Sequence, residues 1–274
     1  MSEGNRGAGF GDQVHQRARD IIARYPEGRE RSALLPLLHL VQAEQGYVSG
    51  DGIAFCAEQL GLTRAQVAAV ASFYTMYKRR PAGEWLISVC TNTMCGVLGG
   101  DRTFGALREH LGVGHDETTD DGVFTLEHAE CLAACDYAPV MTVNYEFFDR
   151  VQAEQAVDIV EQLRRGDRPQ PTRGARLCPL SETSLQLAGY PDERDGAVAE
   201  GGPGDATLAG ARLAERHGVS VAGFDPDTPL SQPAPEVPGH VPPETAPKPA
   251  VDRKPAEEPP PASGQGSEKG GGSK

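Results

Sequence analysis

The sequence predicts an α+β protein: a helical N-terminal region, a small sheet with helices on one face, and a disordered tail. Apolar residues recur at helical spacing from Asp12 to Tyr77. After residues 79–83, RRPAG, the pattern changes to short runs of β-forming residues that alternate with amphipathic segments. Thirteen of the 22 prolines lie after Asp225, so the folding part is shorter than the 274-residue chain.

Four short helices are expected within residues 12–80, after a glycine-rich stretch at 1–11 that we expect to be flexible. The expected helices are 14–25, 32–46, 52–60 and 63–77. Ser32 is the expected N-cap of the second helix, and Gly46 its stop. Thr63 opens the sequence T-R-A-Q, which matches a capping box. Each helix has one apolar stripe, so together they predict a small bundle.

Residues 84–165 are expected to form a β-α-β-β-α unit. The expected strands are 84–90, 123–127 and 140–145, and the expected helices are 101–111 and 153–163. That order suits a small sheet with both helices on one face. Periodicity then fades: 166–200 is expected to be an extension, and 201–274 a disordered Pro/Gly-rich tail in which 208–216 forms one or two helical turns.

Charge and hydropathy exclude several classes of function. The net charge of −13 argues against nucleic-acid binding, which needs a basic face. No apolar run approaches the roughly 20 residues of a spanning helix, and the first residues contain no secretory signal. We therefore expect a cytoplasmic chain with no direct membrane insertion. Thiols stay reduced in the cytoplasm, so clustered cysteines there are more typical of metal ligands or catalytic groups than of disulfides.

Four of the six cysteines form two closely spaced pairs, each in a loop after a predicted strand. The first pair is Cys90 and Cys95, C-x4-C, and the second is Cys131 and Cys135, C-x3-C. Loops at one edge of a sheet converge, so four thiolates can meet. The spacing leaves three interpretations open: an iron–sulfur cluster, a structural zinc site, or unrelated buried cysteines. Neither pair is the tight C-x2-C of most zinc knuckles, which favours the cluster.

Several stretches together resemble a known family. They are LLHLVQAEQGYVS at 37–49, VAAVASFYTMYKRRPAG at 67–83, the C-x4-C at 90–95, and ECLAACDYAPVMTVN at 130–144. In order and spacing they resemble the small iron–sulfur subunit of respiratory NADH:quinone oxidoreductase (complex I), called the E subunit in bacteria. The resemblance covers residues 20–165. It implies a helical region followed by a thioredoxin-like [2Fe–2S] ferredoxin domain.

The resemblance also implies a site and partners. Cys90, Cys95, Cys131 and Cys135 would bind one [2Fe–2S] cluster that exchanges single electrons with the FMN of a partner subunit. FMN and NADH would bind only in that partner, because this chain lacks a strand–GxGxxG–helix fingerprint. The chain would then be an oxidoreductase subunit without a complete active site of its own.

The expected partners are the flavin/NADH-binding subunit and the large iron–sulfur subunit of the complex. The extension at 166–200 is expected to pack on a partner subunit. The resemblance implies a peripheral location. The chain would lie on the cytoplasmic side of the inner membrane, where the rest of the complex holds it. Alternatives are the equivalent subunit of an NAD-linked hydrogenase or formate dehydrogenase, a stand-alone ferredoxin, or a zinc-stabilised interaction module.

A few single residues carry further expectations. The family's second motif often reads ECLGAC, and Ala133 here replaces the glycine, which is tolerable if its φ is negative. Phe73, Tyr74 and Tyr77 are expected to lie in the core rather than on a docking face. Cys56 is expected in a helix core, and Cys178 receives no role. Three histidines are predicted on the surface or in loops, without pairing at ligand spacing: His110, His115 and His128.

Overall fold

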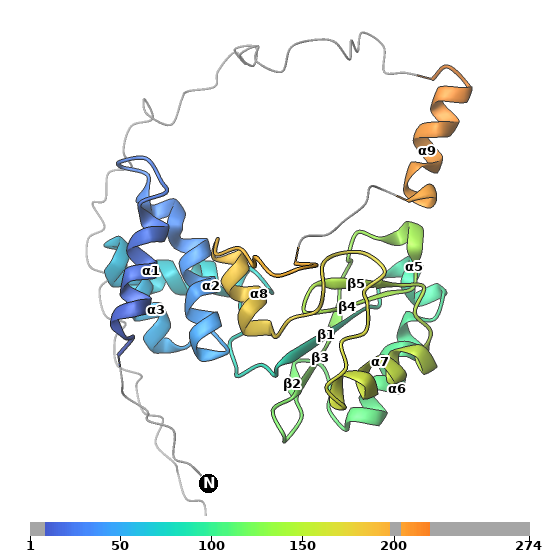
Figure 1. The fold of residues 1–274 in the computed structure, drawn as a ribbon, viewed down its shortest axis with the longest axis horizontal. Coiled ribbons are helices and arrows are strands. Elements are labelled where there is room, and N and C mark those ends of the chain that lie inside the picture. The colour runs from blue at the N-terminus through green and yellow to red at the C-terminus, as the bar shows by residue number, and fades with distance from the viewer. Residues whose placement is uncertain (1–8, 198–203, 220–274) are drawn as a thin grey trace, which may run out of the picture. The chain divides into compact units, whose positions relative to one another are not determined.

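The computed structural model describes residues 9–197 and 204–219 (Figure 1). All of these residues belong to one compact unit that extends to Val219. The predicted α+β class is confirmed: a helical region precedes a five-stranded sheet. Most of the stretch expected to be flexible at 1–11, and most of the tail expected at 201–274, lie outside the described residues.

The helical region contains four α-helices and one 3-10 turn. They are α1 (Asp12–Ile22), η1 (Glu30–Ala33), α2 (Leu34–Gln45), α3 (Gly50–Leu60) and α4 (Arg64–Phe73). The capping box of Thr63 is present, and Gly46 ends α2 with φ of 77°. The N-cap expected at Ser32 is wrong, because η1 leads directly into α2. Helix α4 ends four residues earlier than expected, because Tyr74 has extended backbone.

The sheet has the strand order β2-β3-β1-β4-β5. Its strands are β1 (Trp85–Cys90), β2 (Glu117–Thr118), β3 (Phe124–Ala129), β4 (Val140–Val143) and β5 (Glu146–Asp149). Strand β1 runs parallel to β3 and antiparallel to β4. The short strands β2 and β5 are not expected from the sequence. A cis peptide bond joins Ala138 and Pro139 just before β4.

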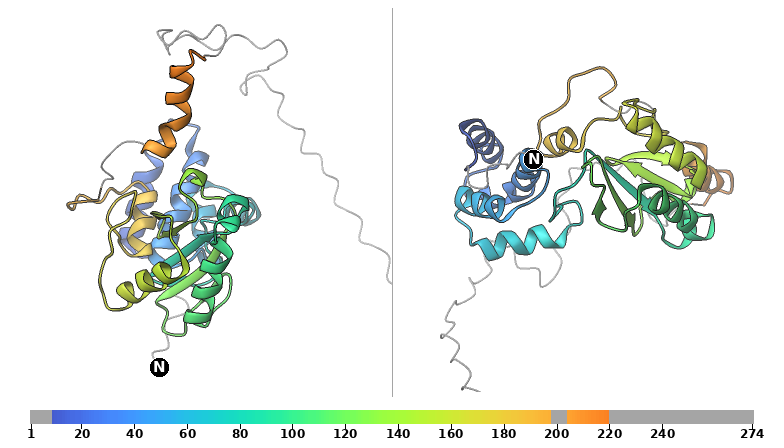
Figure 2. Two further views of the ribbon diagram at one scale, coloured as in Figure 1. Left: turned by 90° about the vertical axis from the view of Figure 1, so that its right-hand side faces the viewer. Right: turned by 90° about the horizontal axis from the view of Figure 1, so that it is seen from below.

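One face of the sheet is apolar and the other is polar. Helices α6 (Gly100–Leu111) and α7 (Ala153–Arg164) lie side by side on the apolar face (Figures 1 and 2). Their core includes Trp85, Ile87 and Val89, which alternate along β1. The intervening Ser88 belongs to the opposite face, where its hydroxyl donates to Glu127. The short helix α5 (Thr93–Val97) follows β1.

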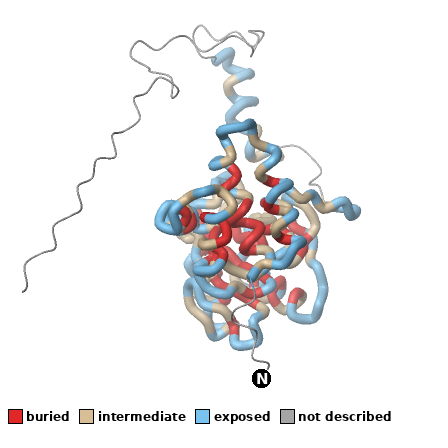
Figure 3. The backbone as a smooth tube through the Cα atoms, turned by 90° about the vertical axis from the view of Figure 1, so that its left-hand side faces the viewer, coloured by how far each residue is buried: buried red, intermediate tan, exposed pale blue. Residues whose placement is uncertain are grey.

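The extension at 166–200 folds back onto the helical region of the same chain. Helix α8 (Leu180–Leu187) packs against α2 of the same chain, and Ala188 joins the core of the helical region. Gln42 Nε2 donates to Ser184 Oγ at 3.3 Å, a contact between α2 and α8. The described part of 166–200 therefore packs at least partly on its own chain, and its expected contact with a partner subunit stays a prediction. Figure 3 shows the buried positions gathered inside the folded unit, with exposed positions around them.

One correction concerns the segment expected to be disordered. Helix α9 (Asp205–Arg216) is a regular three-turn helix within it. None of its residues is buried, and its apolar residues repeat at helical spacing. The Thr207 hydroxyl donates to the Asp136 carboxylate beside the second cysteine pair. The helix is therefore longer than the one or two turns expected at 208–216.

Candidate metal centre

The first cysteine pair lies where β1 ends and α5 begins. Cys90 is the last residue of β1, and Cys95 lies in α5, whose N-cap Asn92 accepts from Thr93 N at 2.8 Å. Gly100 opens the next helix directly behind them. A Cβ at Gly100 would lie 2.4 Å from the Cys90 carbonyl oxygen, so only glycine allows this close approach.

The second pair lies in the loop after β3. Cys131 follows the strand, and Cys135 begins the 3-10 turn η2 (Cys135–Tyr137). Between them Ala133 donates its N–H to Cys131 Sγ at 3.4 Å. Ala133 has φ of 55°, so the condition for a tolerated alanine, a negative φ, is not met. The methyl group therefore strains this turn.

The two pairs differ in exposure. Cys90 and Cys95 are buried, whereas Cys131 and Cys135 are exposed. Apolar neighbours surround the site, among them Ala134 and Val140. One side of the centre is therefore shielded from water, and the other faces outward.

Electrostatic interactions among the four thiols reflect their closeness. Burial raises the pKa of Cys95 to about 11, the Val140 N–H opposes this, and the contact with Cys90 raises it further. A hydrogen bond with Cys131 raises the pKa of the Cys135 thiol. Charge interactions also act between the two pairs. The Cys135 thiolate raises the pKa of Cys95, and the Cys90 thiolate raises the pKa of Cys135. The structure thus brings all four sequence-predicted residues to one edge of the sheet.

The arrangement suits two metal ions better than one. A tetrahedral zinc site needs four ligands around one point. A [2Fe–2S] cluster instead takes two thiolates on each iron. The pairs Cys90/Cys95 and Cys131/Cys135 match that requirement, so the residues present fit the group.

Comparison with known proteins identifies the family. The family model described as thioredoxin-like [2Fe-2S] ferredoxin matches residues 18–164, more than half of the chain. The chain belongs to the thioredoxin-like [2Fe–2S] ferredoxin family. The match includes both the helical region and the sheet, and it spans all four cysteines of the candidate site.

Relatives within the thioredoxin-like ferredoxin family confirm the resemblance to a complex I subunit. The NADH-quinone oxidoreductase E subunit of Mycobacterium tuberculosis (strain H37Rv) is 60% identical over 200 residues, covering 73% of this chain and 78% of that protein. NADH-quinone oxidoreductase subunit 2 of Thermus thermophilus is 35% identical over 161 residues, covering 58% and 89%. A solved NAD+-reducing [NiFe]-hydrogenase aligns with a TM-score of 0.44 and 20% identity, over 48% of this chain and 23% of that one.

The aromatic residues at the end of α4 separate into two groups. Tyr77 is buried and donates from its hydroxyl to Leu35 O at 3.0 Å, as a core residue would. Phe73 is 78% exposed, and Tyr74, which packs edge-on against it, is also exposed. The core expectation therefore holds for Tyr77 and is wrong for the other two.

Two of the three histidines lie in contact. The rings of His115 and His128 are 4.1 Å apart between centroids, and His128 N donates to His115 Nδ1 at 3.2 Å. No such pairing is visible in the sequence, because the fold brings together positions that are far apart along the chain. His110 instead contacts Glu161 on α7 at 2.8 Å.

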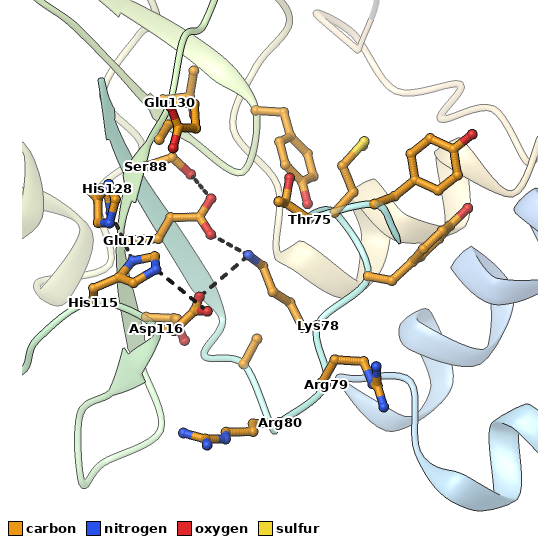
Figure 4. A pocket seen from close by; sticks show the side chains of 18 of the residues that line it. Thr75, Lys78, Arg79, Arg80, Ser88, His115, Asp116, Glu127, His128 and Glu130 are labelled. Carbon is orange, nitrogen blue, oxygen red and sulfur yellow. Dashed lines mark hydrogen bonds and ion pairs between the residues drawn. The ribbon is translucent and has the colours of Figure 1, made fainter. Parts of the chain in front are cut away.

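A polar pocket of about 710 Å³ adjoins the second cysteine pair (Figure 4). Its walls include Lys78, the polar side chains of β1 and β3, and Cys131 itself. The hydroxyl oxygens of Thr142 and Tyr145 are buried there without a hydrogen-bond partner in the part of the chain that the structure describes. The pocket is not among the features predicted from the sequence. The available signal was the polar residues within the predicted strands, at Ser88 and Glu127.

Proposed function

We propose that this chain is the electron-transfer subunit of an NADH:quinone oxidoreductase and holds one [2Fe–2S] cluster on Cys90, Cys95, Cys131 and Cys135. The observation that carries the proposal is the arrangement of the thiols in two pairs at one edge of the sheet. The relatives named as subunits of such oxidoreductases support the assignment. When bound, the cluster supplies one-electron acceptance and donation.

The chain's own groups hold and tune the thiolate sulfurs. The Ala133 N–H donates to Cys131, and the Val140 N–H interacts with Cys95. Such donors stabilise negative charge on sulfur and therefore favour the reduced state. The apolar shell around Cys90 and Cys95 excludes water from the inner pair.

The outer side of the centre is suited to a partner. Helix α5 and its C-cap expose Met94, Val97 and Leu98 around the buried Cys95, and Val97 is 79% exposed. We name these three residues the α5 patch. An exposed apolar patch on the helix that carries the buried Cys95 fits a protein surface that must approach the cluster closely. We assign the flavin/NADH-binding subunit to this patch, because single-electron exchange needs a short distance.

A second exposed patch at Phe73 and Tyr74 fits the other expected partner, the large iron–sulfur subunit. Among the described residues, no helix is long and apolar enough to cross a membrane. The proposed location is peripheral, on the cytoplasmic side of the inner membrane through the complex. It rests on the relatives that are named as subunits of a quinone-reducing oxidoreductase.

Electron paramagnetic resonance of the anaerobically purified full chain tests the proposal. The expected result is a spin-half signal that develops on reduction with dithionite, with iron and acid-labile sulfide each near two per chain, roughly as one [2Fe–2S] cluster requires. A single zinc ion per chain, without sulfide or signal, would overturn it. Purification of the chain from its native host then identifies the complex by the subunits that co-purify. Recovery of hydrogenase or formate dehydrogenase subunits would overturn the assignment to a quinone-reducing complex.

A further inference from the structure

A buried ion pair lies inside the polar pocket (Figure 4). The Lys78 ammonium donates to the Glu127 carboxylate, and their side chains are only 9% and 14% exposed. The other oxygen of that carboxylate accepts from Ser88 Oγ at 2.6 Å. Asp116, which is more exposed, lies 3.9 Å from the Lys78 nitrogen. We name Lys78, Glu127 and Ser88 the pocket network.

The pocket network lies on the strands that carry the proposed ligands. Ser88 is two residues before Cys90 on β1, so their side chains point to the same face about 7 Å apart along the strand. Glu127 pairs with Ser88 in the parallel register, as Ala129 pairs with Cys90. Cys131 follows two residues after Ala129 and lines the same pocket. The Glu127 carboxylate and the Lys78 ammonium that it binds therefore lie about two residues along the strand, roughly 7 Å, from the proposed cluster ligands.

Stability alone does not explain this pair. A buried ion pair loses hydration on both ions, and well-packed apolar side chains of similar size often stabilise a fold as much or more. The opposite face of the same sheet is held by apolar packing of that kind. Charges held in a low-dielectric pocket do act strongly on a nearby group whose own charge changes. Reduction of the cluster adds one negative charge.

We propose that Lys78 and Glu127 are electrostatically coupled to the cluster as a charge-balanced pair, so that loss of either charge alone shifts its reduction potential. The inference rests on the proposed function. Lys78 favours the added electron and Glu127 opposes it, so the intact pair keeps the two effects nearly balanced. Ser88 disperses the charge of Glu127 through its hydrogen bond. Removal of one charge alone should shift the potential, and removal of both should largely restore it.

The test is a redox titration of the full chain, followed by the electron paramagnetic resonance signal. Glu127→Gln leaves the Lys78 charge with only the more exposed Asp116 beside it, at 3.9 Å, and is expected to raise the midpoint potential. The double variant Lys78→Met with Glu127→Gln is expected to return close to the wild-type value. Glu161→Gln on α7, which removes the same charge on the other side of the sheet, is the matched control and should leave the potential unchanged.

Ionic strength separates this effect from a general surface charge. At roughly 0.5 M salt exposed charges are screened, whereas the shift caused by the buried Glu127→Gln change should persist. An unchanged potential in a fully loaded Glu127→Gln chain, or an equal shift in Glu161→Gln, would overturn the inference while the cluster assignment stands. A wild-type chain without iron and sulfide would instead overturn the proposed function.

A second variant covers the case in which Glu127→Gln fails to fold. Ser88→Ala keeps the ion pair and removes only the hydroxyl donor to Glu127. The carboxylate charge is then less dispersed, so the midpoint potential should fall. A loaded Ser88→Ala chain with the wild-type potential would contradict the role of the pocket network.

Discussion

The Ala133 backbone N–H donates to the Cys131 sulfur from a left-handed conformation, with φ of 55°. That region costs an L-residue other than glycine about 1–2 kcal/mol. The turn therefore combines a sulfur contact that suits a thiolate ligand with a residue that fits it poorly. The strained position lies in the exposed half of the proposed site.

Replacement of Ala133 by glycine should relieve this strain. Part of the gain is lost because glycine has greater freedom in the unfolded chain, so we expect a net stabilisation of up to about 1 kcal/mol. The melting temperature should rise by about 2 °C. Ala134→Gly is the control, since Ala134 is buried with φ of −125°, and it should destabilise. Equal losses in both variants would contradict the strain.

Gly100→Ala should disrupt the first cysteine loop. The new methyl group would meet the carbonyl oxygens of Cys90 at 2.4 Å and Cys95 at 2.9 Å, and backbone cannot yield cheaply. We expect a loss of about 1–3 kcal/mol and reduced iron content. Gly105→Ala, in the same helix with open space around it, should instead stabilise by up to about 1 kcal/mol. Chemical denaturation and an iron assay measure both; a wild-type-like Gly100→Ala would refute the close-approach argument.

Substitution of a proposed ligand by serine should abolish the cluster signal. Cys95→Ser and Cys131→Ser remove one thiolate from each pair, so each should lose most of the reduced resonance signal and acid-labile sulfide. Cys178→Ser is a suitable control, because Thr183 and Gln186 already contact that sulfur and can bind a hydroxyl. A full-strength signal in Cys95→Ser or Cys131→Ser would remove that residue from the ligand set.

Val97→Glu should weaken docking of the flavin-binding partner without loss of the cluster. A charge at the centre of the exposed α5 patch opposes burial in an interface, and we expect binding to weaken by roughly 30-fold or more. Co-purification with an affinity-tagged chain measures the effect. Leu187→Glu, at an exposed site on α8, is the control. Equal partner recovery from both variants and wild type would move the interface elsewhere.

His39 makes the helical region sensitive to acid. Burial lowers the pKa of His39 to about 4, and its Nδ1 has no hydrogen-bond partner among the described residues. The unfolded chain takes up this proton near pH 6.5, and the folded chain does so only near pH 4. Stability from this group is therefore complete above pH 6.5 and declines by up to about 3 kcal/mol as the pH falls to 4.

His39→Phe should remove this contribution while keeping the ring contact with Tyr77, whose centroid is 4.8 Å away. Unfolding free energies measured for both proteins near neutral pH and again just above the pKa of His39 give the comparison. The variant should lose less stability than wild type over that interval. Parallel losses would show that His39 does not titrate in this range.

Local signals predicted most of the regular elements. Thr63 and Gln66 lie within one turn of each other and cap α4. The run of β-forming residues at Trp85–Cys90 predicts a strand without any knowledge of its neighbours. The cysteine pairs were visible because each is local. Ser32 was misassigned because an N-cap serine and a serine within a 3-10 turn have the same sequence signature.

The amino-acid sequence was enough to predict the helical and strand periods, the capping of α4, the four candidate ligands and the family to which they point. Three features come instead from long-range packing: α8 docked on α2, the left-handed Ala133, and the contact of Lys78 with Glu127. The reason is physical. Period and caps depend on residues within a few positions, whereas the pocket network depends on a strand register that pairs Ser88 with Glu127, 39 positions apart.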